Sequence, residues 1–145
     1  MTLSPRRVTD TYAVLGQLQP ADLAEAKALG FRSIINNRPD AEEVGQPAAG
    51  DIAQAAAQAG MSYVHIPVSG AIGEEQQQAM AEALATLPQP ILAFCRSGAR
   101  STRIWAHAMQ GQLPQNELLA AAQGAGCDVV ALQAELEQMK ENPHE

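Results

Sequence analysis

The sequence predicts an α/β fold in which a central, mostly parallel sheet of four to five strands is flanked by helices. Short apolar runs at 12–16, 31–36, 61–66 and 91–94 are typical of buried strands. The segments between them are rich in helix-forming residues. Strands that alternate regularly with helices indicate a parallel sheet, because each crossover between parallel strands runs through a helix.

The helical segments carry recognisable boundaries. Pro20 opens the first helix and Gly30 ends it. An alanine-rich helix is expected over 51–59, and the helix over 74–87 begins with an acidic turn that suits the positive end of a helix dipole. From 101 to about 139 the pattern stays helical, with two breaks at glycine-containing segments.

Length and composition predict one domain over residues 1–145, with its core at about 12–139 and a flexible tail at 140–145. The chain has 145 residues, of which 46% are hydrophobic and only 3% aromatic, so aliphatic side chains must form the core. Its net charge of -7 argues against a nucleic-acid partner, because phosphate backbones repel an acidic surface.

The two cysteines, Cys95 and Cys127, are too few for a disulfide framework, so we expect reduced thiols and a cytoplasmic location. No apolar stretch is long enough to span a membrane, and we expect no signal peptide in the first residues. The cysteines and histidines lack metal-ligand spacing, and no cofactor is expected.

The main functional signal lies at 94–101, where a strand leads into a loop that opens a helix. Backbone N–H groups in such a loop, together with the helix N-terminus, form a site for an anion. The same groups and the Arg100 guanidinium favour the thiolate of Cys95, which makes it a nucleophile. We therefore predict that Cys95 and Arg100 are catalytic. The predicted substrate-binding residues of this segment are Arg96, Ser97, Gly98, Ala99 and Ser101.

Ser101 is expected to donate its hydroxyl to the Cys95 thiolate and to cap the following helix. Arg38 and Asp40 lie in the loop after 31–36, which also carries Glu42 and Glu43 and should border the same pocket. Arg38 is predicted to position substrate.

Four side chains, those of Arg38, Asp40, His65 and Cys127, keep alternative roles. Asp40 either orients Arg38 or serves as a displaced acid, while the alternative for both residues is a locally hydrogen-bonded turn. For His65 and Cys127, packing is favoured over titration in the pocket and over a resolving thiol, respectively.

Two chemistries use a thiolate beneath an anion loop: phosphate-ester hydrolysis and sulfane-sulfur transfer. Tyrosine and dual-specificity phosphatases use Cys-x5-Arg, whereas Cys95 and Arg100 are separated by four residues. A phosphatase also needs an acid to protonate the leaving oxygen. The segment 69–72, where dual-specificity phosphatases carry that acid, has no carboxylate. Both departures favour sulfur over phosphate.

Most of the chain, from about residue 12 to 132, resembles the beta-lactamase-hydrolase-like proteins, phosphatase-like domain, which is also described as a sulfur transferase family. The matching segments are Gly16-Gln17, 30–40, 43–47, 65–68 and 95–101. The resemblance implies a cysteine-phosphatase-like fold of the dual-specificity type that carries a rhodanese-like Cys-x4-Arg loop. Fusion of such domains to persulfide dioxygenases implies a role in sulfide detoxification.

The first hypothesis is therefore a rhodanese-like sulfurtransferase. A Cys95 persulfide would carry sulfur from thiosulfate or a low-molecular-weight persulfide to a thiol or cyanide acceptor. Its expected partners are a small anionic sulfur donor, a thiol acceptor and a persulfide dioxygenase. The alternative is a dual-specificity or tyrosine-type phosphatase that works through a Cys95 phosphocysteine. A second alternative is a non-catalytic module that binds an anion or a partner.

Overall fold

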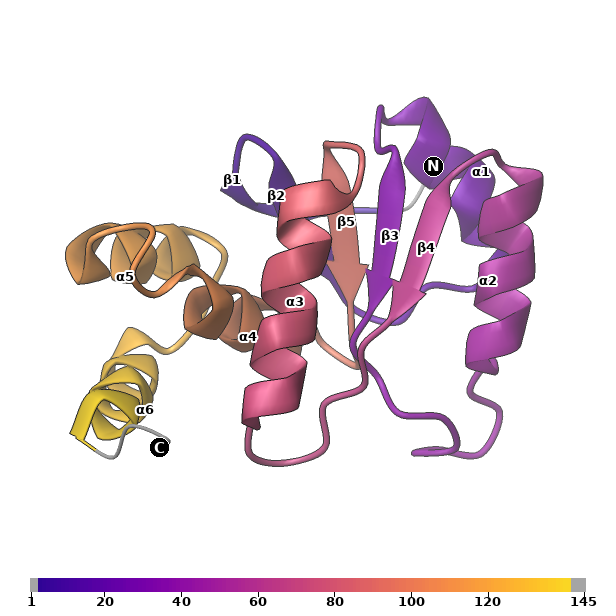
Figure 1. Cartoon of the computed structure of the whole chain (residues 1–145). Coiled ribbons are helices and arrows are strands. Elements are labelled where there is room, and N and C mark those ends of the chain that lie inside the picture. Colours follow the sequence, from indigo (N-terminus) through magenta and orange to yellow (C-terminus); the bar gives the residue numbers. More distant parts are fainter. Residues whose placement is uncertain (1–2, 142–145) are drawn as a thin grey trace.

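Five short strands form one mixed sheet in the computed structural model, which describes residues 3–141 (Figure 1). The strand order is β1-β2-β5-β3-β4. All neighbouring pairs are parallel except β1 and β2, which are antiparallel. This architecture confirms the predicted α/β class. The strands are β1 (Arg6–Thr9), β2 (Tyr12–Leu15), β3 (Ser33–Asn36), β4 (Ser62–His65) and β5 (Ile91–Phe94).

Six α-helices and one short 3-10 helix connect and cover the strands within the described residues. The single helical region expected over 101–139 is divided into α4, α5 and α6, at the two breaks that the sequence indicated. Residues 140 and 141 of the expected tail belong to α6, and 142–145 lie outside the described residues. The helices are η1 (Pro20–Asp22), α1 (Leu23–Ala28), α2 (Ala49–Gln58), α3 (Glu74–Thr86), α4 (Ala99–Met109), α5 (Gln115–Gly124) and α6 (Val129–Glu141).

The sheet separates two hydrophobic cores, because successive side chains of a strand point to opposite faces. Leu92 and Phe94 of β5 belong to the core that α1 and α2 cover. Ile91 and Ala93 of the same strand belong to the core formed with α3 to α6. Figure 1 shows these two helical layers on either side of the sheet. Both faces of β5 are therefore buried, which explains its continuous apolar sequence.

The first strand, β1, was not expected, and the predicted start of the core near residue 12 was too late. Val8 of β1 is buried in the core, whereas Arg6 and Arg7 are exposed. Charged residues are common on edge strands because they discourage pairing with another chain. They also hide the apolar alternation on which the sequence prediction depended.

The parallel register brings the ends of four strands into one row. Leu15 pairs with Phe94, Phe94 with Asn36, and Asn36 with His65. The loops that follow β2, β5, β3 and β4 therefore leave the same edge of the sheet, where open α/β sheets bind ligands.

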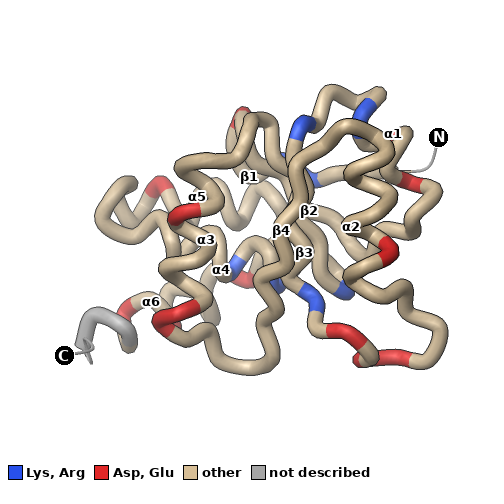
Figure 2. The backbone as a smooth tube through the Cα atoms, turned by 45° about the vertical axis from the view of Figure 1, so that its right-hand side comes forward, with Lys and Arg blue, Asp and Glu red and all other residues tan. Residues whose placement is uncertain are grey.

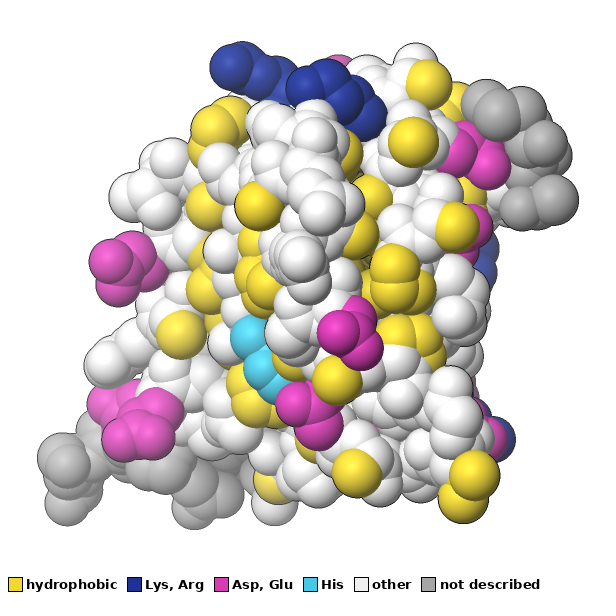
Figure 3. Space-filling view, turned by 90° about the vertical axis from the view of Figure 1, so that its right-hand side faces the viewer, with side chains coloured by type: hydrophobic (Ala, Val, Ile, Leu, Met, Phe, Trp, Pro, Cys, Tyr) yellow, Lys and Arg dark blue, Asp and Glu magenta, His cyan; other side chains and the backbone are white. Residues whose placement is uncertain are grey.

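The surface gives little sign of an apolar site elsewhere on the face shown in Figure 3. Hydrophobic side chains are dispersed there among polar groups, with a group of basic side chains at the top edge and acidic ones at several places on the face (Figure 3). None of the helices within residues 3–141 is long and apolar enough to cross a lipid bilayer.

Candidate active site

The loop at residues 95–100, named here the anion loop, is fixed by the buried strand before it and the helix after it. Cys95 is 1% exposed and directly follows β5. The backbone N–H of Gly98 donates to Cys95 Sγ at 3.0 Å. Gly98 has a φ of 98° and precedes the first residue of α4, so the loop turns into the helix through a left-handed backbone that favours glycine. The sulfur thus lies beside the N-terminus of an 11-residue helix.

Residues outside the motif hold the back of the anion loop. The Arg6 guanidinium donates from Nε to the carbonyl of Ala125 and from Nη2 to the carbonyl of Ser97, each at 2.8 Å. A Cβ at Gly16 would lie 2.9 Å from the carbonyl oxygen of Arg96. Gly16 therefore permits the turn after β2 to approach the anion loop closely, and Arg6 ties the loop to both β1 and the end of α5.

The predicted roles of Ser101 were wrong. Its hydroxyl donates to Asn37 Oδ1 at 2.8 Å, and its carbonyl accepts a hydrogen bond from the Tyr12 hydroxyl at 2.8 Å. Because α4 begins at Ala99, Ser101 lies inside the helix and does not cap it. Asn37 in turn bonds the carbonyls of Phe94 and Ile66 through its backbone and side-chain amides. Ser101 therefore joins α4 to the loops that follow β3 and β4.

Tyr12 keeps its proton in this environment. Burial, followed by the nearby charge of Cys95, raises the pKa of Tyr12 well above its ordinary value. The phenol is therefore a hydrogen-bond donor to α4 rather than a second titrating group beside the thiol.

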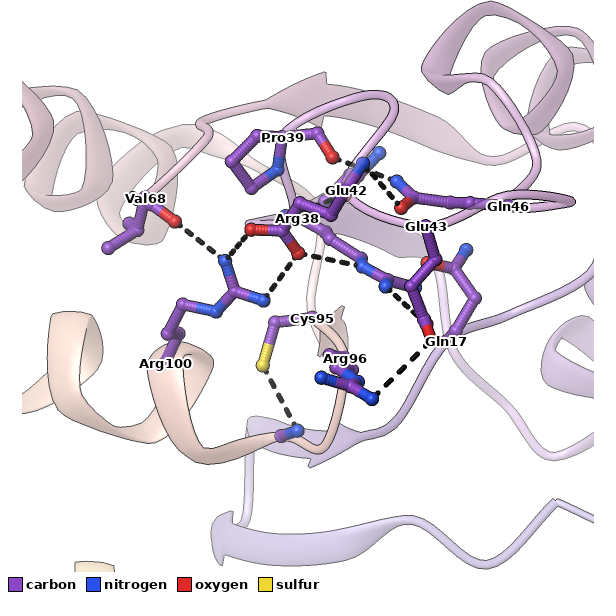
Figure 4. A network of polar contacts seen from close by, with 12 residues as sticks. Gln17, Arg38, Pro39, Glu42, Glu43, Gln46, Val68, Cys95, Arg96 and Arg100 are labelled. Carbon is purple, nitrogen blue, oxygen red and sulfur yellow. Dashed lines mark hydrogen bonds and ion pairs between the residues drawn. The ribbon is translucent and has the colours of Figure 1, made fainter. Parts of the chain in front are cut away.

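Arg100 lies over Cys95 and points its guanidinium fork at a carboxylate. Its Nη1 and Nη2 donate to Oε2 and Oε1 of Glu42 at 2.7 and 2.8 Å, and Nη1 also donates to the carbonyl of Val68 at 2.8 Å. Figure 4 shows Cys95 beneath this pair, in the space between Arg100 and Arg96. The hydrogen bond from Arg100 is the largest cause that lowers the pKa of Glu42, to about 2, and Glu42 likewise raises the pKa of Arg100.

Arg38 is buried beside this pair rather than open to substrate. Its side chain is 3% exposed, and it donates from Nε to Glu42 at 2.9 Å and from Nη2 to Glu43 at 2.7 Å. Its Nη1 donates to Gln17 Oε1 at 3.0 Å. The role of Arg38 visible in the structure is to organise residues 37–48, named here the acidic loop.

Asp40 lies apart from this cluster. Its Oδ1 accepts the backbone N–H of Ala49, the first residue of α2, at 2.7 Å. This contact favours the locally hydrogen-bonded turn among the roles considered for Asp40, and the carboxylates that orient Arg38 are Glu42 and Glu43. His65 has a structural contact as well, because its Nε2 bonds the carbonyl of Arg38 at 2.8 Å.

The remaining predicted residues divide between the two sides of the anion loop. The side chain of Arg96 is 67% exposed and reaches Glu43 at 3.4 Å. Ser97 and Ala99 line a cavity of about 380 Å³ on the side that faces the C-terminal helices, together with Cys127. Burial, followed by Asp128, raises the pKa of the Cys127 thiol, so this cysteine is no reactive thiolate.

Charges of both signs are concentrated where the two loops meet. Figure 2 shows basic and acidic segments together at the end of the sheet below β3 and β4. Arg38, Arg96 and Arg100 are there, paired with Glu42 and Glu43. Within residues 3–141, no three Cys, His, Asp or Glu side chains are grouped so that they could hold a metal ion.

Sequence reasoning missed the site roles of Arg6, Gln17, Glu42 and Glu43. The carboxylates were visible as charges in a loop that leaves the carboxyl end of a strand. Arg38 and Glu42 are four positions apart, a spacing that indicates an ion pair on a helix. In this loop, which is not a helix, the spacing did not predict their contact. The roles of Arg6 and Gln17 depend on contacts with residues more than 20 positions away, which the sequence does not reveal.

A protein-family model described as "Beta-lactamase hydrolase-like protein, phosphatase-like domain" matches residues 4–113. The chain belongs to this family. A beta-lactamase hydrolase-like protein of Agrobacterium fabrum is 35% identical over 135 residues, which cover 91% of this chain and 31% of the relative. The chain thus spans about a third of the length of the curated relatives it matches.

Solved structures agree with the fold. A protein of Neisseria meningitidis described as a "putative phosphatase" superposes with a TM-score of 0.79 at 30% identity, covering 91% of this chain and 95% of that one. A kinase associated phosphatase, crystallised with its catalytic-site cysteine replaced by serine, superposes with a TM-score of 0.71 at 16% identity. That match covers 92% of this chain and 89% of the phosphatase, and it bears on the fold alone.

These comparisons contradict the sulfurtransferase hypothesis and favour its alternative. The family is described as phosphatase-like, and the Neisseria meningitidis protein, 30% identical to this chain, is described as a "putative phosphatase". The argument from spacing failed because Arg100 reaches over Cys95 despite the shorter loop. The argument from the missing acid considered the segment after β4, whereas the carboxylates that contact Arg100 and Arg38 come from the loop after β3. The sulfur donor, the thiol acceptor and the dioxygenase partner were predicted only as parts of that hypothesis.

Proposed function

We propose that this domain is a cysteine-dependent phosphatase that hydrolyses phosphate monoesters through a Cys95 phosphocysteine. The observation that carries the proposal is the arrangement around one sulfur. Cys95 Sγ accepts the Gly98 N–H at 3.0 Å, lies at the start of α4, and has the Arg100 guanidinium above it. Helix N-termini and oriented N–H groups bind phosphate, and an arginine fork matches two of its oxygens.

The reaction begins when a phosphate ester occupies the anion loop. The loop N–H groups and the Arg100 fork hold its non-bridging oxygens and stabilise the charge of the transition state. The Cys95 thiolate attacks phosphorus, an S–P bond forms, and the bond from phosphorus to the alcohol oxygen breaks. Water then attacks the phosphocysteine, which releases inorganic phosphate and restores the thiolate. The buried β5 and the contacts of Ser101 keep the nucleophile and Arg100 in one geometry.

The substrate and setting follow from charge and thiol chemistry. The net charge of -7 disfavours nucleic acids, so we propose a phosphorylated small molecule or protein side chain as substrate. A cytoplasmic location is proposed because the reaction needs a reduced Cys95, and both cysteines are free.

The direct test is hydrolysis of p-nitrophenyl phosphate and a phosphotyrosine peptide by the wild-type protein and by Cys95→Ser. We expect turnover that Cys95→Ser abolishes, and a phosphocysteine that rapid acid quenching traps for mass spectrometry. Circular dichroism and tungstate binding check that Cys95→Ser is folded with an intact loop. Tungstate binding without turnover by the wild type would overturn the proposal in favour of a binding module, and turnover that survives Cys95→Ser would overturn the role of the thiol.

A further inference from the structure

In the candidate active site, the carboxylate of Glu42 occupies the arginine that faces Cys95. Glu42 accepts from both terminal nitrogens of Arg100, which is the fork that a bound phosphate would require. Cys95 is 1% exposed and lies beneath this pair. A phosphate that reaches the sulfur must therefore take Arg100 away from Glu42.

Glu42 has a second partner that can keep it nearby after this exchange. Arg38 Nε donates to Glu42 Oε1 at 2.9 Å, and the Arg38 side chain is 3% exposed. The backbone of Arg38 is anchored as well, because its N–H donates to Asn36 Oδ1 and its carbonyl bonds His65. Glu42 belongs to a loop without regular structure and is 28% exposed, so its carboxylate can turn from Arg100 while Arg38 stays fixed.

The exchange changes the chemistry of Glu42. The hydrogen bond from Arg100 is the largest cause that holds the pKa of Glu42 at about 2, so the carboxyl is ionised while the pair exists. When phosphate occupies Arg100, Glu42 loses this partner and gains an anion as its neighbour. Both changes favour the protonated carboxyl. Substrate binding would thus load a proton beside the scissile ester bond.

The other carboxyl groups of the acidic loop are committed elsewhere. Glu43 pairs with Arg38 and Arg96, and Asp40 binds the N–H at the start of α2. The segment 69–72 after β4 has no carboxylate. Among these groups Glu42 alone touches the arginine that faces Cys95.

We propose that Glu42 is the proton donor of this phosphatase and, without substrate, the ligand that occupies Arg100. This inference rests on the proposed function. In the first step the Cys95 sulfur bonds phosphorus, the phosphorus–oxygen bond breaks, and the leaving oxygen takes the Glu42 proton. The products are an alcohol, a phosphocysteine and the Glu42 carboxylate. In the second step the water oxygen attacks phosphorus while the Glu42 carboxylate accepts a proton from that water. The sulfur–phosphorus bond breaks, which restores the Glu42 acid and the Cys95 thiolate.

Glu42→Gln separates the two roles because the amide keeps the size of the side chain but carries neither the charge nor an acidic proton. Turnover of phenyl phosphate, whose leaving group needs a proton, should fall about 100-fold or more. Turnover of p-nitrophenyl phosphate, whose leaving group is stable as an anion, should fall far less. Binding of tungstate, a phosphate analogue that needs no protonation, should tighten about threefold or more because no anion competes for Arg100.

Glu43→Gln is the matched control, since it removes the neighbouring carboxylate that contacts Arg38 and Arg96 but not Arg100. It should leave the ratio of the two turnover rates unchanged, and it should raise tungstate affinity less than Glu42→Gln does, because Glu43 does not contact Arg100. If Glu42→Gln slows both substrates equally, the proton-donor role is overturned, and if tungstate affinity does not rise, the ligand role is overturned. Absence of Cys95-dependent turnover in the wild type would instead remove the proposed function, and the inference with it.

Discussion

The two loops that meet over Cys95 are held by opposite means. The anion loop is fixed mainly through its backbone, by β5, by the start of α4 and by Arg6, which bonds a main-chain carbonyl. The acidic loop is fixed mainly through charged side chains that pair with Arg38 and Arg100. Backbone contacts give one geometry, whereas ion pairs can exchange partners. Under the proposed function, the first loop would set the geometry of phosphate binding and the second would respond to the substrate.

The largest effect is expected at Arg100, where the two loops touch. Arg100→Lys keeps the positive charge but loses the fork that binds two oxygens at once. We expect kcat/KM for p-nitrophenyl phosphate to fall at least about 100-fold, as for loss of other donors to a developing anion. Arg103→Lys is the control, because Arg103 lies on the same helix but pairs with Glu135. Equal activity of the two variants would contradict a special role for the Arg100 fork.

Gly98→Ala tests whether the anion loop depends on its backbone. The φ of 98° strains any residue with a Cβ, and that Cβ would collide with the Arg6 guanidinium and lie 3.4 Å from the Leu15 carbonyl. We expect the free energy of unfolding, measured with urea, to drop by about 1–3 kcal/mol, and activity to decline with it. Gly50→Ala in α2, where a Cβ meets nothing within 4 Å, should leave stability unchanged or higher. A stable, active Gly98→Ala would mean that the loop tolerates another geometry.

Asp40→Ala separates structural from functional carboxylates within the acidic loop. Removing the acceptor of the Ala49 N–H should lower the free energy of unfolding by about 1 kcal/mol, as for loss of a helix-start contact. Turnover of phenyl phosphate should fall much less than it does in Glu42→Gln. Thermal unfolding and steady-state kinetics on the same samples measure both. A larger loss of turnover than in Glu42→Gln would return Asp40 to the role of acid.

The smallest effect is expected when the pH is lowered and the free energy of unfolding is measured. Because the pKa of Glu42 is about 2 in the folded protein and ordinarily 4.5, its pairing stabilises the fold fully above about pH 4.5. That contribution is lost progressively as pH falls from 4.5 towards 2. We expect the stability difference between the wild type and Glu42→Gln to shrink over this window, from at most about 1 kcal/mol for a partly exposed pair. Urea titrations at pH 7 and pH 3 measure it, and a difference that grows in acid would contradict the pairing.

The sequence was most informative where neighbouring residues determine the structure. Cys95, the loop and Arg100 are contiguous, so their strand–loop–helix context could be read directly, and the apolar runs located four of five strands. Partners distant in the chain could not be predicted. Ser101 finds Asn37 only because the parallel register places β3 beside β5.

The choice between sulfur and phosphate failed for the same reason. The carboxylate nearest Arg100 comes from the loop after β3, 58 positions earlier in the chain. The acid was sought after β4 and at Asp40, not at Glu42, and a count of residues between Cys95 and Arg100 cannot reveal a side chain that arrives from another strand.

Through its contacts, Arg6 would link the order of folding to the appearance of the proposed activity. Its two bonds join β1, the anion loop and the end of α5, which are up to 119 positions apart. Contacts between such distant parts of a chain carry a large loop-closure cost and tend to form late. A chain still emerging from the ribosome would thus lack the finished anion loop until α5 had been made and had docked. Only the completed domain would then be catalytically active, and a partly folded chain would not hydrolyse the phosphorylated molecules around it.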